Sequence, residues 1–135
     1  MSPPKELSNP SRRGGAVEPI EIRILRQRIS NEELRAFLHR PFAEMIKFVV
    51  DVDQQVIALG GELHADAEEL LLEAGSFQEN LWGGNLYPDG KSLDEQIEYS
   101  ALINIRPSQE NRSMLVQSAV IRTQMQQVVQ MLIEL

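Results

Sequence analysis

The stretch Phe48-Val49-Val50-Asp51-Val52-Asp53-Gln54-Gln55-Val56-Ile57-Ala58-Leu59 decides the fold class. Two runs rich in β-branched residues flank a polar turn at residues 53–55. Runs of this length and composition are typical of strands, and a short turn between them predicts a hairpin of antiparallel strands. We therefore expect an antiparallel sheet at the centre of the molecule.

Upstream of this hairpin the sequence predicts a strand and a helical segment. Apolar and polar side chains alternate over residues 20–25, which is the period of a half-buried strand. Residues 30–33 read Ser-Asn-Glu-Glu, a capping box that opens a helix. Pro41 ends or kinks this helix, and residues 42–46 are predicted to continue as a second helical piece.

Downstream of the hairpin the pattern predicts further strands. The second strand of the hairpin is expected to run on through residues 60–66. Another hairpin then pairs residues 70–73 with residues 81–87. A short helix over residues 67–73 is the alternative, because a short apolar run does not distinguish helix from strand. Alternation over residues 97–105 predicts a last strand.

A final helix completes the predicted fold. Ser118 is placed to cap it, and its apolar stripe consists of Ile121, Met125, Val128, Val129 and Leu132. The fold class is α+β: a mainly antiparallel, meander-like sheet of about five strands, with an N-terminal helical segment and a C-terminal helix packed on one face. Residues 19–135 form this single domain. Residues 1–18, rich in Ser, Pro and Gly, are predicted to be a disordered tail.

Composition excludes several classes of protein. The 135 residues include no cysteine, which excludes disulfides, zinc-finger-type sites and thiol nucleophiles. No apolar run approaches the ~20 residues of a membrane-spanning helix, so no membrane partner is expected. Residues 1–47 carry nine Lys/Arg and six Asp/Glu, a net charge of +3, whereas residues 48–135 carry four and fourteen, a net charge of −10. Because phosphate backbones require clustered cations, nucleic acid is not an expected partner. We expect a cytoplasmic protein of bacterial type.

Glu62, His64 and Asp66 are the candidate catalytic residues. On the predicted strand they share one face, with side chains about 6–7 Å apart. A histidine between two carboxylates is typical of acid–base catalysis, and equally of a structural hydrogen-bonding residue. One histidine without cysteine does not make a transition-metal site, so neither a metal nor another cofactor is predicted.

Residues 103–113, Ile-Asn-Ile-Arg-Pro-Ser-Gln-Glu-Asn-Arg-Ser, are the candidate ligand-binding segment. Arg106 and Arg112 offer planar guanidinium groups to a carboxylate or phosphate. Further ligand contacts are predicted from Ser108, Gln109, Asn111, Trp82 and Asn85. Gly83-Gly84, beside Trp82, predicts a bulge or a close approach by a backbone or a ligand. The alternative is that the polar residues of this segment cap backbone groups and form ion pairs within the fold.

Three segments of the chain also carry a resemblance to a family. They are Gly60-Gly61-Glu62-Leu63-His64-Ala65-Asp66, Leu81-Trp82-Gly83 with Asn85-Leu86-Tyr87-Pro88, and residues 103–113. Together they resemble a small bacterial family catalogued as a domain of unknown function. The resemblance covers roughly residues 20–135, and it implies a bacterial, cytoplasmic protein without implying any chemistry.

Two functional hypotheses follow. In the first, a small anionic ligand is bound, or acted on, between the acidic row and the arginine-containing segment on the polar face of the sheet; whether the protein is an enzyme stays open. In the second, the protein is an interaction module or homodimer, with Trp82 or the C-terminal helix as its apolar anchor. Convergence of the acidic row with Arg106 and Arg112 on one pocket would favour the first hypothesis.

Overall fold

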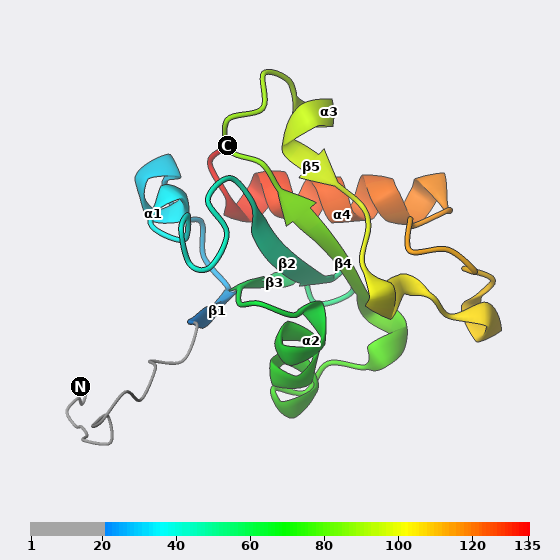
Figure 1. The fold of residues 1–135 in the computed structure, drawn as a ribbon. Helices are drawn as coiled ribbons and strands as arrows, with labels where there is room; N and C mark the ends of the chain where they lie inside the picture. Colours follow the sequence, from blue (N-terminus) through cyan, green and yellow to red (C-terminus); the bar gives the residue numbers. More distant parts are fainter. Residues whose placement is uncertain (1–20) are drawn as a thin grey trace.

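The computed structural model describes residues 21–135 (Figure 1). The predicted tail, together with residues 19 and 20, lies outside the described residues. The helices and strands are, in chain order, β1 (Ile22–Leu25), α1 (Asn31–Arg35), β2 (Ile46–Asp51), β3 (Val56–Gly60), α2 (His64–Glu73), β4 (Leu81–Leu86), α3 (Leu93–Gln96), β5 (Ile97–Glu98) and α4 (Ala119–Leu132). Three short 3₁₀ turns are η2 (Gln78–Asn80), η3 (Leu102–Asn104) and η4 (Pro107–Gln109).

The five strands form one sheet in the order β1-β3-β2-β4-β5, and every neighbouring pair is antiparallel. The hairpin predicted from residues 48–59 is present as β2 and β3, with Phe48 opposite Leu59 and Asp51 opposite Val56. The predicted α+β class with a mainly antiparallel sheet is therefore confirmed.

Side chains alternate between the two faces of this sheet, which gives the molecule three layers. Phe48, Val50 and Trp82 lie in the larger core cluster together with Met125 and Val129 of α4. The smaller cluster on the opposite face consists of Val49, Ala58, Leu81, Ala67 and Leu71, the last two from α2. Figure 1 shows the sheet between these two helices. The C-terminal helix packs on one face as predicted, and α2 covers part of the other.

Both predicted helix starts are confirmed. Ser30 accepts a hydrogen bond from the N–H of Glu33, whose carboxylate accepts one from the N–H of Ser30, so the capping box is complete. The Ser118 hydroxyl accepts from the N–H of Ile121 and opens α4. Caps of this kind depend on residues within one turn, which is why the sequence predicts them well.

Residues 42–46 are not a second helical piece, and that prediction was wrong. α1 ends at Arg35, and β2 already begins at Ile46. Ile46 enters the larger core cluster and pairs with Leu86 of β4. Because β2 is bonded to strands on both sides, sheet pairing outweighs the weak helical pattern of this short segment.

The strand ends at Gly60 and does not continue through residues 61–66, and residues 70–73 are not part of a hairpin. Both predictions were wrong, whereas the alternative helix is confirmed as α2 (His64–Glu73). Gly60 and Gly61 have φ angles of 104° and 89°, a conformation that glycine adopts readily and that ends a strand. The chain therefore turns from β3 into the first turn of α2.

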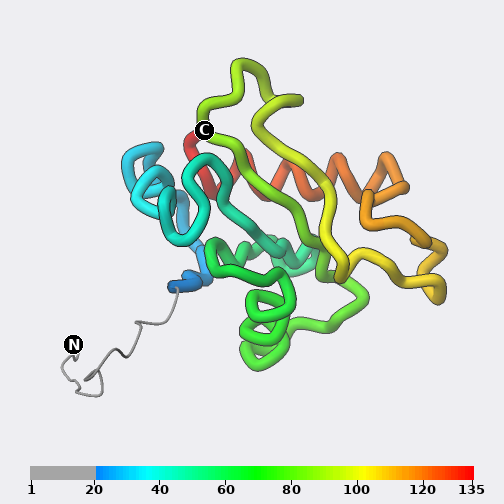
Figure 2. The backbone as a smooth tube through the Cα atoms, in the orientation of Figure 1, coloured from blue at the N-terminus to red at the C-terminus, as the bar shows by residue number. Residues whose placement is uncertain are grey.

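The last predicted strand, residues 97–105, is much shorter in the structure. Only Ile97–Glu98 pairs with β4, and Figure 2 shows the chain continuing as a long loop toward α4. Beyond β5 the side chain of Asn104 accepts from the N–H of Gly83 (2.8 Å) and donates to the carbonyl of Gly83 (3.0 Å). This one side chain occupies the hydrogen-bonding positions that a continuing strand would have used.

Candidate functional site

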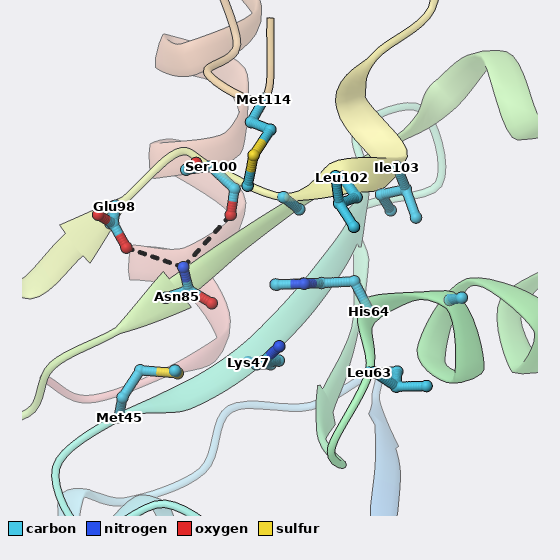
Figure 3. A pocket seen from close by; sticks show the side chains of 12 residues that line it. Met45, Lys47, Leu63, His64, Asn85, Glu98, Ser100, Leu102, Ile103 and Met114 are labelled. Atoms are coloured by element: carbon cyan, nitrogen blue, oxygen red, sulfur yellow. Dashed lines mark hydrogen bonds between the residues drawn. The ribbon is translucent and has the colours of Figure 1, made fainter.

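A cavity of about 410 Å³ opens on the face of the sheet that carries α2 (Figure 3). Its polar lining consists of Lys47, His64, Asn85, Glu98 and Ser100. The apolar lining comes mainly from Met45, Leu63, Leu102, Ile103 and Met114. This volume lies at the small end of the range of about 300–1,000 Å³ that is typical of small-molecule pockets.

Three polar residues cross the floor of the cavity in a single row. Lys47 of β2 is the register partner of Asn85 of β4, which in turn is opposite Glu98 of β5. The residues on either side of Lys47, Ile46 and Phe48, enter the core beneath α4. Because strand residues alternate between faces, Lys47 and its two partners lie on the opposite side, beside α2.

Asn85 leaves one polar atom without a partner in this cavity. Its side-chain nitrogen donates to Oε1 of Glu98 (2.8 Å) and to the carbonyl of Ser100 (3.3 Å). Both groups only accept, so the orientation of the amide is set. Asn85 is 8% exposed, and its Oδ1 has no hydrogen-bond partner within residues 21–135. Figure 3 shows this oxygen on the side of the cavity, facing His64 and Lys47.

His64 forms one wall of the cavity and is held by the backbone of β4. Its Nε2 lies 2.8 Å from the carbonyl of Gly84, which can only accept, so Nε2 carries a proton. Burial lowers the pKa of His64, and the nearby Lys47 lowers it further, although the hydrogen bond to Gly84, the adjacent Asn85 side chain and the charge of Glu98 act in the opposite direction. At neutral pH the imidazole is therefore uncharged and has one accepting nitrogen.

Gly83 allows the imidazole to lie against the sheet. A Cβ atom at this position would be 2.7 Å from Cβ of Ala101 and 3.1 Å from Cδ2 of His64. Contacts this short require the neighbours to move. Side chains make the close contacts at Gly83, whereas the close approach by a backbone that the sequence predicted for this glycine pair occurs at Gly84, where a Cβ would lie 2.5 Å from the carbonyl oxygen of Glu98.

The first turn of α2 also faces the cavity. Leu63, the N-cap residue, provides no side-chain hydrogen bond, and it lines the cavity together with His64 and Ala65. In the part of the chain that the structure describes, the N–H groups of His64 and Ala65 have no acceptor. Unpaired N–H groups give a helix start a partial positive charge. This side of the cavity therefore carries a partial positive charge, which the exposed Asp66 of the same turn reduces.

Lys47 adds a full positive charge to the same side. Among residues 21–135 it forms no ion pair, and its Nζ lies 5.4 Å from the centre of the Phe42 ring. Figure 3 shows Lys47 on the same side of the cavity as His64, and its charge lowers the pKa of that imidazole. Glu98 lies at the other end of the row, so the cavity is positive at one end and negative at the other.

The predicted row of Glu62, His64 and Asp66 does not exist. His64 and Asp66 belong to a helix, where residues two apart point in different directions, and the prediction that all three share a strand face was wrong. Glu62 and Asp66 are exposed and do not line the cavity. Within residues 21–135 no group of three His, Cys, Asp or Glu side chains is placed to hold a metal ion.

The guanidinium of Arg106 is hydrogen-bonded within the fold rather than exposed to a ligand. Arg106 is 8% exposed, and its guanidinium donates to the carbonyls of Gln78 and Leu81 and to Oε1 of Gln109. The guanidinium carbon lies 4.0 Å from the centre of the Trp82 ring, a cation–π contact, and Nε has no hydrogen-bond partner within residues 21–135. Trp82 is in the core, so neither side chain reaches the cavity.

The other residues nominated in segment 103–113 are also separate from the cavity. Asn111 is buried, and its amide donates to the carbonyls of Asn104, Ser113 and Leu115. Gln109 donates to the carbonyl of Glu79 (3.0 Å). Ser108 and Arg112 are exposed. Segment 103–113 thus builds its own loop, and of all the nominated residues only His64 and Asn85 meet at the cavity.

Sequence reasoning missed Lys47 as a site residue and did not nominate Glu98. Lys47 stands between two core residues in an apolar run, and a charge at such a position indicates that the strand has a polar patch on its other face. The pairing that joins Lys47, Asn85 and Glu98 has no local signal, since these residues are far apart in the chain.

Comparisons with known proteins identify the family of the chain but not its function. Among residues 21–135 no helix combines the length and apolar character needed to cross a bilayer. No curated protein and no solved structure matches the chain. One family model, for proteins of unknown function (DUF5674), matches residues 23–132, a range that includes every residue lining the cavity. The resemblance to a family of unknown function is thereby confirmed: the chain belongs to the DUF5674 family.

Proposed function

We propose that this protein binds a small molecule with an acidic group in the cavity between α2 and strands β2, β4 and β5. The observation that carries the proposal is the buried Oδ1 of Asn85, which lacks a partner among residues 21–135 and faces a cavity that Lys47 also lines without an ion pair among those residues. An unsatisfied buried acceptor costs about 1–3 kcal/mol, and a bound donor removes that cost.

The acidic group follows from the charge of the cavity. Lys47 supplies a full positive charge without an ion-pair partner among the described residues, and the first turn of α2 adds a partial positive charge, which Asp66 in the same turn reduces. A carboxylate or phosphate bound there would accept hydrogen bonds from both. Of the residues nominated from the sequence, His64 and Asn85 line this cavity. Lys47 would bind the acidic group in place of Arg106 and Arg112, which do not line it.

A thermal-shift screen tests this proposal directly. Wild-type protein is heated with small carboxylates and phosphates, and an acid at 100 times its Kd should stabilise the fold by about 2.7 kcal/mol. Lys47→Met should abolish the shift. Lys91→Met removes the same charge from an exposed loop outside the cavity, and its shift should equal that of wild type. Equal stabilisation of the Lys47 variant, or no stabilisation by any acid, would overturn the proposal.

The second hypothesis, an interaction module or homodimer, stays a prediction with weaker support. Both of its expected anchors are used inside the fold: Trp82 is buried, and the apolar stripe of α4 lies in the larger core cluster. The cytoplasmic location and the bacterial origin likewise stay predictions. Light scattering of the purified protein would show whether it is a monomer.

A further inference from the structure

The polar groups of the cavity are sorted by type from one end to the other. At the β2 end are donors: the ammonium of Lys47 and the free N–H groups of His64 and Ala65. In the middle of the row Oδ1 of Asn85 is an acceptor without a partner among residues 21–135, and at the β5 end is the carboxylate of Glu98. A ligand with one acidic group satisfies only the first end.

The acceptor end has room for a cation. Oε1 of Glu98 accepts from Asn85 (2.8 Å) and from the hydroxyl of Tyr87 (3.2 Å), whereas Oε2 has no partner within residues 21–135. The two open acceptors, Oδ1 of Asn85 and Oε2 of the exposed Glu98, thus belong to neighbouring residues of the β4–β5 register pair, with the Asn85 oxygen turned toward Lys47 and His64. An ammonium group has three donors and a positive charge, which suits this pair.

The two ends are close together, which limits the size of the polar part of the ligand. Lys47, Asn85 and Glu98 occupy three adjacent strands, and neighbouring strands are about 4.8 Å apart. The acidic and basic groups of one ligand must therefore be separated by only a few bonds. Above the row, Leu63, Leu102 and Met114 offer an apolar surface that is partly open to solvent.

Building on the proposed function, we infer that the ligand is a zwitterion of the α-amino-acid class with an apolar side chain. Its carboxylate binds at Lys47 and the first turn of α2, its ammonium binds at Asn85 and Glu98, and its side chain packs against Leu102 and Met114. This arrangement satisfies the orphan Oδ1 and places opposite charges at both ends of the row.

Isothermal titration with a matched series tests the inference. The probes are L-methionine and L-leucine, the N-acetyl derivative of each, which lacks the ammonium, and the amide of each, which lacks the carboxylate. Either free amino acid should bind at least about tenfold more tightly than both of its derivatives, because each derivative loses a charge-assisted hydrogen bond.

Two variants locate the ammonium. Glu98→Gln keeps an oxygen for Asn85 and Tyr87 but removes the charge, so binding of the free amino acid should weaken and approach that of its N-acetyl derivative. Glu69→Gln, an exposed residue of α2 outside the cavity, should change neither value.

The outcomes separate the two proposals. N-acetyl derivatives that bind as tightly as the free amino acids would overturn the zwitterion and leave the acid-binding cavity standing. Amides that bind as tightly as the free amino acids would overturn the acidic group, and with it the proposed function. If Glu98→Gln leaves the binding of free amino acids unchanged, the ammonium does not bind at Glu98 and this inference is overturned. The absence of any binding in the series would also sink it, while the wider screen of acids decides the proposed function.

Discussion

Loop 103–113 and the cavity beside His64 contain the same kinds of polar residue and use them in opposite ways. In the loop, Asn104, Arg106 and Asn111 are buried, and their side chains are bonded to backbone groups. In the cavity, the oxygen of Asn85 is buried without a partner and Lys47 has no counterion among residues 21–135. The buried polar side chains of the loop are hydrogen-bonded within the fold, whereas the oxygen of Asn85 and the ammonium of Lys47 remain available to a ligand.

The comparison shows what distinguishes a structural polar residue from a binding residue. The residue type does not distinguish the two roles, because arginine and asparagine suit both of them. The hydrogen-bonding capacity that remains in the folded protein does distinguish them, since a side chain already bonded to backbone groups can form few further hydrogen bonds with a ligand. Three experiments probe this contrast, in order of decreasing effect.

Arg106→Met tests the structural role of the loop and should have the largest effect. The variant keeps the apolar stem but leaves the carbonyls of Gln78 and Leu81 without their charged donor. We expect a loss of about 3 kcal/mol in the free energy of unfolding, measured by urea denaturation. Arg112→Met is the control and should change stability by less than about 0.5 kcal/mol, because Arg112 is exposed. Similar stabilities for the two variants would show that Arg106 does not hold the loop.

Gly83→Ala tests the packing that holds His64 in the cavity. The added methyl group would meet Cβ of Ala101 and the imidazole, so we expect a loss of about 2 kcal/mol and a displaced ring. Thermal unfolding gives the stability, and the imidazole NMR signals report the ring. Adding Ala101→Gly removes the closest clash and should restore part of the loss. A fully stable Gly83→Ala variant would contradict the tight contact.

The pH dependence of stability tests the burial of His64 and should be the smallest effect. Because the pKa of His64 is lowered in the folded protein, the unfolded chain takes up a proton first as the pH falls. The contribution is complete above the ordinary histidine value near 6.5 and is lost as the pH falls through 6.5 toward the lowered pKa. One proton changes stability by at most about 1.4 kcal/mol per pH unit. Denaturant midpoints between pH 7.5 and 5.5 should therefore decline more in wild type than in His64→Gln, and equal declines would rule out a buried, neutral His64.

Local features of the fold were predictable from the sequence. The β2–β3 hairpin, the Ser30 capping box and the Ser118 cap all depend on residues within a few positions of one another. The wrong predictions have a common cause. Residues 60–66 and 97–105 show strand-like alternation, but Gly60-Gly61 turns the chain in the first segment and the Asn104 side chain replaces a strand in the second.

The sequence by itself determined the fold class, the hairpin and the helix starts, and it nominated His64 and Asn85, which both line the cavity. Only the tertiary structure decided that Lys47, Asn85 and Glu98 form one row and that Arg106 belongs to the fold. The physical reason is that backbone conformation follows from neighbours in the chain, whereas the hydrogen-bond partners of a side chain come from distant segments. Whether a polar group is satisfied or open is therefore settled only when those segments meet.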